Sequence, residues 1–299
     1  MISRRWALGA AAAFSAFSAA AVGRAFAQTH GLGAPGLGAP AFDDDPALVM
    51  AIGGPQRSAA NKARDGWRHP LQSLDFWGLA PGLTVIDIDP GGGYWTEILG
   101  PYLAQGGGHY LAGLGDPDDP DTDEGARRAR AAFAARYGAA AVYGPIGYVA
   151  FSAGKGLLAP PASADMILFA RYVHDLVDKP GAVDRAFASF YAALAPGGVL
   201  ALEEHRSDPR AMLADASDGY VSEDYVIAAA AKAGFALAAR SEINANPKDS
   251  KDHPFGVWTL PPTRRSAPEG QPPNPAFDHA KFDAIGESDR MTLRFVKPR

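Results

Sequence analysis

The sequence predicts an α/β domain in which helices cover both faces of a parallel β-sheet. Short, almost entirely apolar runs such as 83–88 and 165–170 have the composition of strands that are buried on both faces. Helical patterns separate these runs, and the turns at 81–82 and 196–198 consist of proline and glycine. Hydrophobic residues make up 47% of the 299 residues, which is enough to build a core and excludes a wholly disordered chain.

Strands and helices are expected to alternate along the chain. The stretch 94–103 places apolar residues on one helical face, and Pro180 suits the first turn of a helix. Ser222 is a typical N-cap, and Gly234 is a typical C-terminal stop. We therefore expect strands at 83–88, 109–114, within 142–151, and at 165–170, 199–203, 235–243 and 291–296, with helices at 94–103, about 124–137, from 180 to 194 and from 222 to 234.

The N-terminus has the features of an export signal. Residues 1–27 combine the pair Arg4-Arg5, an alanine-rich apolar stretch and the ending Ala25-Phe-Ala27, which predicts twin-arginine export to the periplasm and cleavage after Ala27. The alternative is a frayed N-terminal helix. The apolar stretch is too weakly hydrophobic to predict a membrane span. Residues 28–41 repeat Gly-Leu-Gly-Ala-Pro and are expected to be a linker before a domain at 42–299.

Composition excludes several classes of function. The net charge is −5 and there is no sustained basic block, so nucleic-acid binding is not expected. There is no cysteine, which excludes disulfides, thiolate metal sites and cysteine nucleophiles. No two histidines have the helical i, i+4 spacing, and we expect no metal site. The Gly-x-Ser-x-Gly motif of serine hydrolases is absent.

The unit formed by the strand at 83–88 and the glycines that follow it is the most informative feature. Gly91, Gly92 and Gly93 allow the backbone to approach a ligand, and the following helix offers free N–H groups there. Asp87 lies inside an apolar strand, where burial is costly without a donor or a cationic ligand nearby. Thr96 breaks the dinucleotide-binding pattern, and no Walker lysine follows. The alternative is a tight structural turn.

The run Asp87-Ile-Asp-Pro-Gly91-Gly-Gly93 resembles the acidic, glycine-rich first motif of class I S-adenosylmethionine-dependent methyltransferases. The resemblance covers essentially all of 43–299 and is closest to an exported, little-characterised subgroup of predicted methyltransferases. One departure is that Asp89 stands where the wider class has its first glycine. The motifs that carry the resemblance are Asp89-Pro-Gly-Gly-Gly-Tyr-Trp-Thr-Glu97, Arg171-Tyr-Val-His174, Glu203-Glu-His205-Arg, Ser241-Glu-Ile-Asn-Ala-Asn-Pro-Lys-Asp249, Gly256-Val-Trp-Thr-Leu-Pro-Pro262 and Gly286-Glu-Ser-Asp-Arg-Met-Thr-Leu-Arg294.

The resemblance implies a Rossmann-like, seven-stranded and mostly parallel sheet whose last strand is antiparallel. It implies that S-adenosylmethionine binds at the carboxyl ends of the first two strands, with Asp87 at the amino-acid end of the cofactor. We expect Asp116 to bind the ribose, although the acidic run 116–124 also fits a solvated loop. The same run does not fit the calcium-binding EF-hand pattern. The expected cofactor-binding residues are Asp87, Asp89, Gly91, Gly92, Gly93, Asp116 and Arg171.

Two clusters of polar residues follow strands that end at the same edge of the sheet. Ligands of open α/β sheets bind beyond the carboxyl ends of the strands, so we expect His174, Glu204 and His205 to be catalytic. The alternative is that these histidines are structural. Arg171 and Arg206 either neutralise an acidic substrate or pair with Glu203 or Glu204.

The polar stretch 244–290 separates the last two expected strands and is unusually long for an irregular connection. Both of its ends should lie at the ligand edge of the sheet, so we expect a lid over the substrate. The alternative is a proline-stiffened loop packed on the rim. Arg57, Asn61, Arg64 and Asp65 are expected to cover the cofactor from the N-terminal side, and Trp67 and Trp77 to lie in the core. The expected substrate-binding lid residues are Asn244, Asn246, Lys248, Asp249, Lys251, His253 and Trp258.

These observations together predict an S-adenosylmethionine-dependent methyltransferase that acts on a small polar acceptor. A lid that excludes water and aligns the methyl donor with its acceptor is the main contribution expected for such a transfer. The alternative is a binding protein on the same fold, without catalysis or with a different one, because a fold does not determine a reaction.

Overall fold

The computed structural model describes residues 45–152 and 156–299. The predicted signal at 1–27, its cleavage site and the linker at 28–41 lie outside the described residues. Within the described ranges, no helix is both long and apolar enough to cross a membrane.

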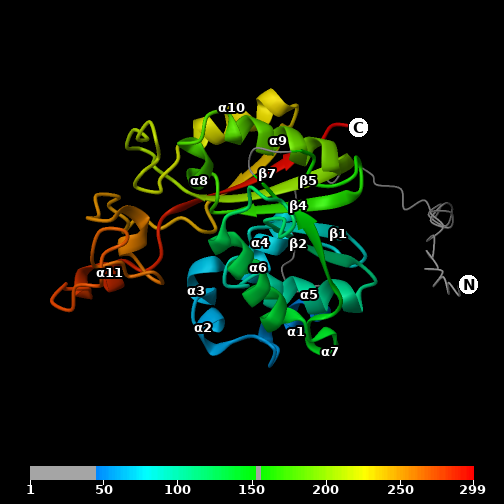
Figure 1. Cartoon of the computed structure of the whole chain (residues 1–299), viewed down its shortest axis with the longest axis horizontal. Helices are drawn as coiled ribbons and strands as arrows, with labels where there is room; N and C mark the ends of the chain where they lie inside the picture. The colour runs from blue at the N-terminus through cyan, green and yellow to red at the C-terminus, as the bar shows by residue number, and fades with distance from the viewer. Residues whose placement is uncertain (1–44, 153–155) are drawn as a thin grey trace, which may run out of the picture. The chain divides into compact units, whose positions relative to one another are not determined.

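In the described part of the chain, seven strands form one sheet in the order β3-β2-β1-β4-β5-β7-β6 (Figure 1). β7 runs antiparallel to both of its neighbours, β5 and β6, and the other neighbouring pairs are parallel. The fold class predicted from the sequence is therefore confirmed. The strands are β1 Thr84–Ile88, β2 His109–Leu114, β3 Ile146–Ala150, β4 Ala164–Ala170, β5 Leu194–His205, β6 Ala236–Ser241 and β7 Arg290–Val296.

Several helices begin at residues whose side chains cap them. Asp45, Asp123 and Ser222 each accept a hydrogen bond from a backbone N–H in the first turn of the helix that follows. The helices are α1 Pro46–Gly53, α2 Ala59–Lys62, α3 Asp65–Arg68, α4 Pro70–Trp77, α5 Thr96–Gln105, α6 Glu124–Tyr137, α7 Ala140–Tyr143, α8 His174–Val177, α9 Ala182–Ala193, α10 Glu223–Ala233 and α11 Ala280–Ile285, with a 3₁₀ turn at Gly256–Thr259.

Two hydrophobic cores lie on opposite faces of the sheet. Alternate residues of one strand point to opposite faces, so Ile86 and Ile88 pack in one core and Val85 packs in the other. Helices α9 and α10 cover the first face, and α1, α4 and α5 cover the second (Figure 1). Because both faces are buried, ligands have access mainly at the ends of the strands.

The segment between β6 and β7 is more ordered than an irregular loop. It contains the 3₁₀ turn and α11, and it has a small core of its own formed by Leu260, Phe282 and Ile285 with Phe277 against them. The orange and red part of Figure 1 follows this segment beyond the edge of the sheet where β6 ends and β7 begins.

The two tryptophans expected in the core differ in their burial. Trp77 is fully buried, and its indole N–H donates to the carbonyl of Leu293. Trp67 is 37% exposed, so its expected place in the core is wrong. One part of its ring packs against Gly286 at the edge of the segment, where a Cβ atom on that glycine would come within 2.3 Å of the ring.

Candidate active site

The glycine loop after β1 keeps the backbone conformation of a glycine-rich turn. Asp89 has φ +46°, and Gly91 and Gly93 have φ +52° and +76°. Aspartate is one of the few residues other than glycine that adopt this left-handed conformation readily. The departure from the class I motif at Asp89 therefore leaves the turn itself intact.

Of the loop glycines, Gly93 is the one that packing requires. A Cβ atom at this position would lie 2.0 Å from the hydroxyl oxygen of Tyr137, which itself donates to the carbonyl of Gly92. A Cβ atom on Gly92 would meet no atom within 4 Å. The helix α6, which carries Tyr137, thus holds the loop in place from outside.

Asp87 is directed into the sheet. It is 1% exposed and accepts a 2.8 Å hydrogen bond from the hydroxyl of Tyr110 on β2, which in turn contacts the hydroxyl of Thr96 at 2.8 Å. Asp87 lines neither of the two cavities described below. Burial raises its pKa to about 7, and the hydrogen bond from Tyr110 opposes the shift only in part.

We predict that Asp87→Asn stabilises the protein above pH 7. Because the folded-state pKa is raised above the unfolded value, the free energy of unfolding of the wild type falls as the pH rises from about 4 to about 7. The amide keeps an acceptor for Tyr110 and has no charge to bury. The gain should reach up to about 4 kcal/mol, at the ~1.4 kcal/mol that one pKa unit represents.

Urea unfolding of both proteins at pH 5 and pH 8 tests this prediction. The difference in stability between them should be larger at pH 8. An equal difference at the two pH values would mean that the carboxylate is not held in its neutral form by burial.

A first cavity of about 520 Å³ lies at the carboxyl ends of β1 and β2. This volume is in the range of small-molecule sites. Its walls include Asp89, the stretch Gly113–Gly115, Phe151 and Tyr172, with the two aromatic rings 5.7 Å apart.

The acid expected to hold a ribose does not line the first cavity. Asp116 accepts a 3.0 Å hydrogen bond from the N–H of Asp118, within its own turn. The members of the acidic run 116–124 that lie on the cavity wall are Asp121 and Asp123, and Asp123 also caps α6. The sequence did not show which members of the acidic run face the cavity.

A second cavity of about 300 Å³ adjoins the first, and Asp89 and Tyr172 line both. The other residues around it come from distant parts of the chain, which the fold brings together at the carboxyl ends of β4 and β5. They include Arg64, Arg68, Arg171, His174, His205 and Trp258.

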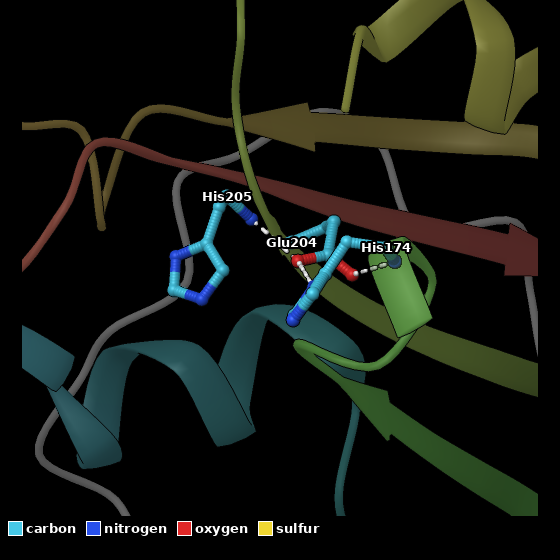
Figure 2. A group of neighbouring side chains, drawn as sticks. All are labelled: His174, Glu204 and His205. Atoms are coloured by element: carbon cyan, nitrogen blue, oxygen red, sulfur yellow. Dashed lines mark hydrogen bonds and ion pairs between the residues drawn. The ribbon is translucent and has the colours of Figure 1, made fainter. Parts of the chain in front are cut away.

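His174 and Glu204 form a hydrogen-bonded pair at the second cavity (Figure 2). His174 Nδ1 lies 2.9 Å from Glu204 Oε1, and Glu204 also accepts hydrogen bonds from the N–H groups of Val173 and His205. Burial lowers the pKa of His174, but the charge and hydrogen bond of Glu204 outweigh it, so the pKa is raised. Glu204 is fully buried and orients the imidazole.

His205 lies beside this pair in a different electrostatic environment. Its ring centre is 5.3 Å from that of His174, and its Nδ1 is 2.5 Å from the hydroxyl of Ser288. Burial, followed by the charges of His174 and Arg171, holds the pKa of His205 well below its usual value. His205 is therefore neutral at pH 7. The pKa values of the two histidines are shifted in opposite directions, upward for His174 and downward for His205.

Four arginines and two glutamates form a continuous ion-pair network next to the histidines. Glu287 pairs with Arg64 at 2.6 Å, Arg68 at 2.9 Å and Arg290 at 2.7 Å. Glu203 pairs with Arg290 at 3.1 Å and lies 3.8 Å from Arg171. We call these six residues the arginine cluster.

Sequence reasoning did not assign Arg68, Glu287 or Arg290 to the site. The available signal was that Glu287 and Arg290 fall in the motif 286–294, which contributed to the family resemblance.

His174, Glu204 and His205 place potential metal-ligand atoms within 4.8 Å of one another. No metal site was expected, because no two histidines have the i, i+4 spacing of ligands on one helix, and this spacing does not report ligands that the fold brings together. Arg171, Arg290 and Arg68 lie close enough to lower the pKa of His205, and their charge opposes the binding of a cation. The electrostatics therefore disfavour a metal ion at this group of residues.

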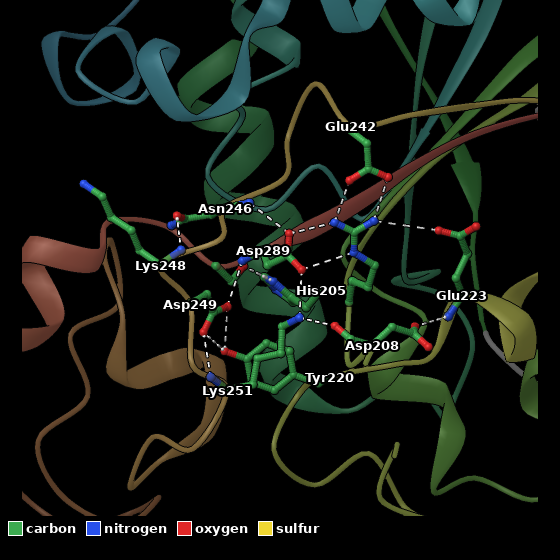
Figure 3. A network of polar contacts seen from close by, with 12 residues as sticks. His205, Asp208, Tyr220, Glu223, Glu242, Asn246, Lys248, Asp249, Lys251 and Asp289 are labelled. Carbon is green, nitrogen blue, oxygen red and sulfur yellow. Dashed lines mark hydrogen bonds and ion pairs between the residues drawn. The ribbon is translucent and has the colours of Figure 1, made fainter. Parts of the chain in front are cut away.

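Most of the expected lid residues are bonded within the segment (Figure 3). Asp249 accepts hydrogen bonds from the Tyr220 hydroxyl and from the N–H of Asp289, and it lies 2.7 Å from His253 Nε2. Asn246 donates to the carbonyls of Ile285 and Glu287. These contacts join the start of the segment to its end, so the residues that make them stabilise the segment.

The other expected lid residues also make contacts away from the second cavity or are exposed, with the exception of Trp258. Asn244 donates to the hydroxyls of Ser73 and Thr292, Lys251 pairs with Asp289, and Lys248 is exposed. Of the seven expected lid residues, only Trp258 lines the second cavity.

Arg206 and the charged residues expected to cover the cofactor from the N-terminal side form ion pairs within the protein. Arg206 pairs with Glu242 and Asp289, which differs from both pairings that the sequence suggested. Arg57 forms a bidentate pair with Asp65 at 2.6 and 2.7 Å. Asn61 is buried, and Arg64 is the member of this group that lines the second cavity.

Among known proteins, the chain resembles several solved structures. No protein-family model and no curated protein matches the chain. A SAM-dependent methyltransferase from Aquifex aeolicus is 19% identical, with 67% of this chain and 93% of that chain covered and a TM-score of 0.47. An S-adenosylmethionine-dependent methyltransferase from Mesorhizobium loti is 17% identical, with 78% and 99% covered and a TM-score of 0.45. The cyclase SpnF is 15% identical, with 84% and 91% covered and a TM-score of 0.45. Similarity at this level does not extend to function.

Proposed function

We propose that the protein is an S-adenosylmethionine-dependent methyltransferase that acts on a small polar acceptor. The observation that carries the proposal is the pair of adjoining cavities. The first lies against the glycine loop and the end of β2, the second is lined by His174, and both share Asp89 and Tyr172. Such a shared wall suits two ligands that react with each other.

The first cavity has the features that an adenosyl group requires. Gly113 and Gly115 expose backbone at the end of β2, Phe151 and Tyr172 offer aromatic faces, and Asp121 and Asp123 offer acceptors for hydroxyl groups. When bound, S-adenosylmethionine supplies an electrophilic methyl group on its sulfonium. Asp89 lies where the two cavities meet.

In the second cavity, His174 is the group suited to remove a proton from the acceptor. Its Nδ1 is bonded to Glu204, so Nε2 is the nitrogen left to accept a proton from an O–H or N–H nucleophile. The carboxylate of Glu204 stabilises the imidazolium that results. We thus assign His174 as the base and Glu204 as a positioning residue, and His205 as a neutral neighbour that contacts the acceptor.

The His174–Glu204 pair favours this proposal over a binding protein without catalysis. An ion-paired histidine is costly to bury, and ligand binding alone does not need one.

Filling the first cavity tests the proposal. Ala126 lies on the wall of this cavity and Ala132 is exposed on the same helix, so Ala126→Phe and Ala132→Phe are matched variants. Calorimetry with S-adenosylhomocysteine should show binding to the full chain and to Ala132→Phe, with affinity reduced at least about tenfold in Ala126→Phe, which is ~1.4 kcal/mol. No binding by the wild-type chain at millimolar ligand, or equal affinity in both variants, would contradict it.

A further inference from the structure

Arg68 has an unusual environment for a charged side chain. It is fully buried at the end of α3 and lies on the wall of the second cavity. Its Nε donates to Glu287 at 2.9 Å, but Nη1 and Nη2 have no hydrogen-bond partner in the described structure. A buried donor without a partner costs about 1–3 kcal/mol, and more when it is charged. These two nitrogens are therefore donors that a ligand could satisfy.

The arginine cluster has more positive than negative charge. Its four arginines face two glutamates, Glu203 and Glu287, so the cluster carries a net charge of +2. Burial and the charge of Arg171 lower the pKa of Arg68 well below its usual value. The Tyr94 ring, 4.6 Å from the Arg68 guanidinium, stabilises the charge only in part.

Three of the four arginines of the cluster line the second cavity. Arg64 and Arg171 line it together with Arg68, and the neutral His205 adds no charge. Three acids line the same cavity: Glu287, which belongs to the arginine cluster, and Asp89 and Asp175, which come from the glycine loop and α8. An anionic group is therefore favoured at the arginines, and a cationic group at the acids.

We propose that the second cavity binds an oxyanion group, a carboxylate or a phosphate, on Arg68, with Arg64 and Arg171 beside it. A guanidinium with two free N–H donors matches the two oxygens of such a group. Resting on the proposed function, this makes the methyl acceptor an anion held next to His174. The same chemistry is present in the amino-acid carboxylate of the methyl donor, and the experiment separates these two sources.

The first measurement needs no methyl donor. Calorimetry with inorganic phosphate and with acetate, in a buffer of low ionic strength, should show binding to the full-length protein. Arg68→Met should weaken it at least about tenfold. Arg128→Met is the control, because Arg128 is 70% exposed and pairs with Glu124 on the surface of α6. Arg64→Met is a second variant, which keeps the test informative if Arg68→Met does not fold.

The second measurement identifies the source of the anion. If phosphate still binds when S-adenosylhomocysteine is saturating, the anion belongs to the acceptor. If Arg68→Met instead weakens the binding of S-adenosylhomocysteine but not of methylthioadenosine, which lacks the carboxylate, the anion belongs to the donor. Both outcomes support the site.

Two further outcomes separate this inference from the proposed function. Failure of phosphate and acetate to bind, with unchanged affinity of Arg68→Met for S-adenosylhomocysteine, overturns the oxyanion site and leaves the methyltransferase proposal intact. Binding of the anions without any binding of S-adenosylhomocysteine supports the oxyanion site and contradicts the methyltransferase proposal.

Discussion

His174→Gln is expected to reduce kcat for methyl transfer by about 10²–10⁴-fold, the usual contribution of a general base. The amide side chain cannot accept the proton of the acceptor, although it can still hydrogen bond to Glu204. Affinity for S-adenosylhomocysteine should stay unchanged, because His174 does not line the first cavity. The measurement is the rate of S-adenosylhomocysteine formation with an acceptor that the wild-type protein methylates.

The pH dependence gives an independent check on this role. His174 must be neutral to act as a base, and its pKa is raised above the usual 6.5. The rate should therefore increase with pH, with its midpoint above pH 6.5, and His174→Gln should lose this dependence. His109→Gln is the control, because His109 is exposed at the start of β2. Full turnover in His174→Gln, or a rate that falls together with cofactor affinity, would contradict the assignment.

Glu287→Gln is expected to destabilise the protein by about 3–5 kcal/mol, the cost of breaking a buried ion pair by removing one partner. Glu287 is 4% exposed and is the carboxylate shared by Arg64, Arg68 and Arg290. Without its charge, only Glu203 remains to compensate the four arginines. Urea unfolding at pH 7 measures the effect.

The control for this variant is Glu269→Gln. The Glu269 side chain is 85% exposed and lies 3.5 Å from Arg265, so its removal should change stability by no more than about 0.5 kcal/mol. A similarly small effect for Glu287→Gln would show that the arginine cluster does not need this carboxylate.

The difference in stability between the wild type and Glu287→Gln should also become smaller in acid. Burial raises the pKa of Glu287, but Arg68, Arg290 and Arg64 outweigh it and hold this pKa well below the usual 4.5. A depressed folded-state pKa contributes stability above the unfolded value and loses it as the pH falls toward the folded value. The difference between wild type and Glu287→Gln should therefore shrink below about pH 4.5.

The fold could be predicted from the sequence because its signals are local. Each buried strand is a short apolar run, and residues such as Ser222 and Gly234 mark helix ends by their own chemistry. The antiparallel direction of the last strand is a long-range property and was expected only from the family resemblance, and the position of β7 between β5 and β6 was not predicted.

The candidate site was only partly predictable. His174 begins the short helix after β4, and Glu204 lies at the carboxyl end of β5, so the topology alone brought them to one edge of the sheet. The contact between Arg68 and Glu287 joins residues 219 positions apart, and no local pattern reports it.

The lid residues show a second limit of the sequence. The polar residues of 244–253 give the same sequence pattern whether their side chains face a ligand or one another. In the structure, Asn246 and Asp249 bond within the segment. Twin-arginine export and a periplasmic location stay predictions from residues 1–27.

The arginine cluster also has a consequence for how the chain matures. Arg64 and Glu287, which bond directly, are separated by 223 positions, so the second cavity forms only when the two ends of the domain have met. A nascent polypeptide that still lacks its final residues has all of the glycine loop but not the complete arginine cluster. Closing so long a loop is entropically costly and is expected late in folding. Binding of a ligand in the second cavity would then distinguish full-length chains from chains that lack their C-terminal residues.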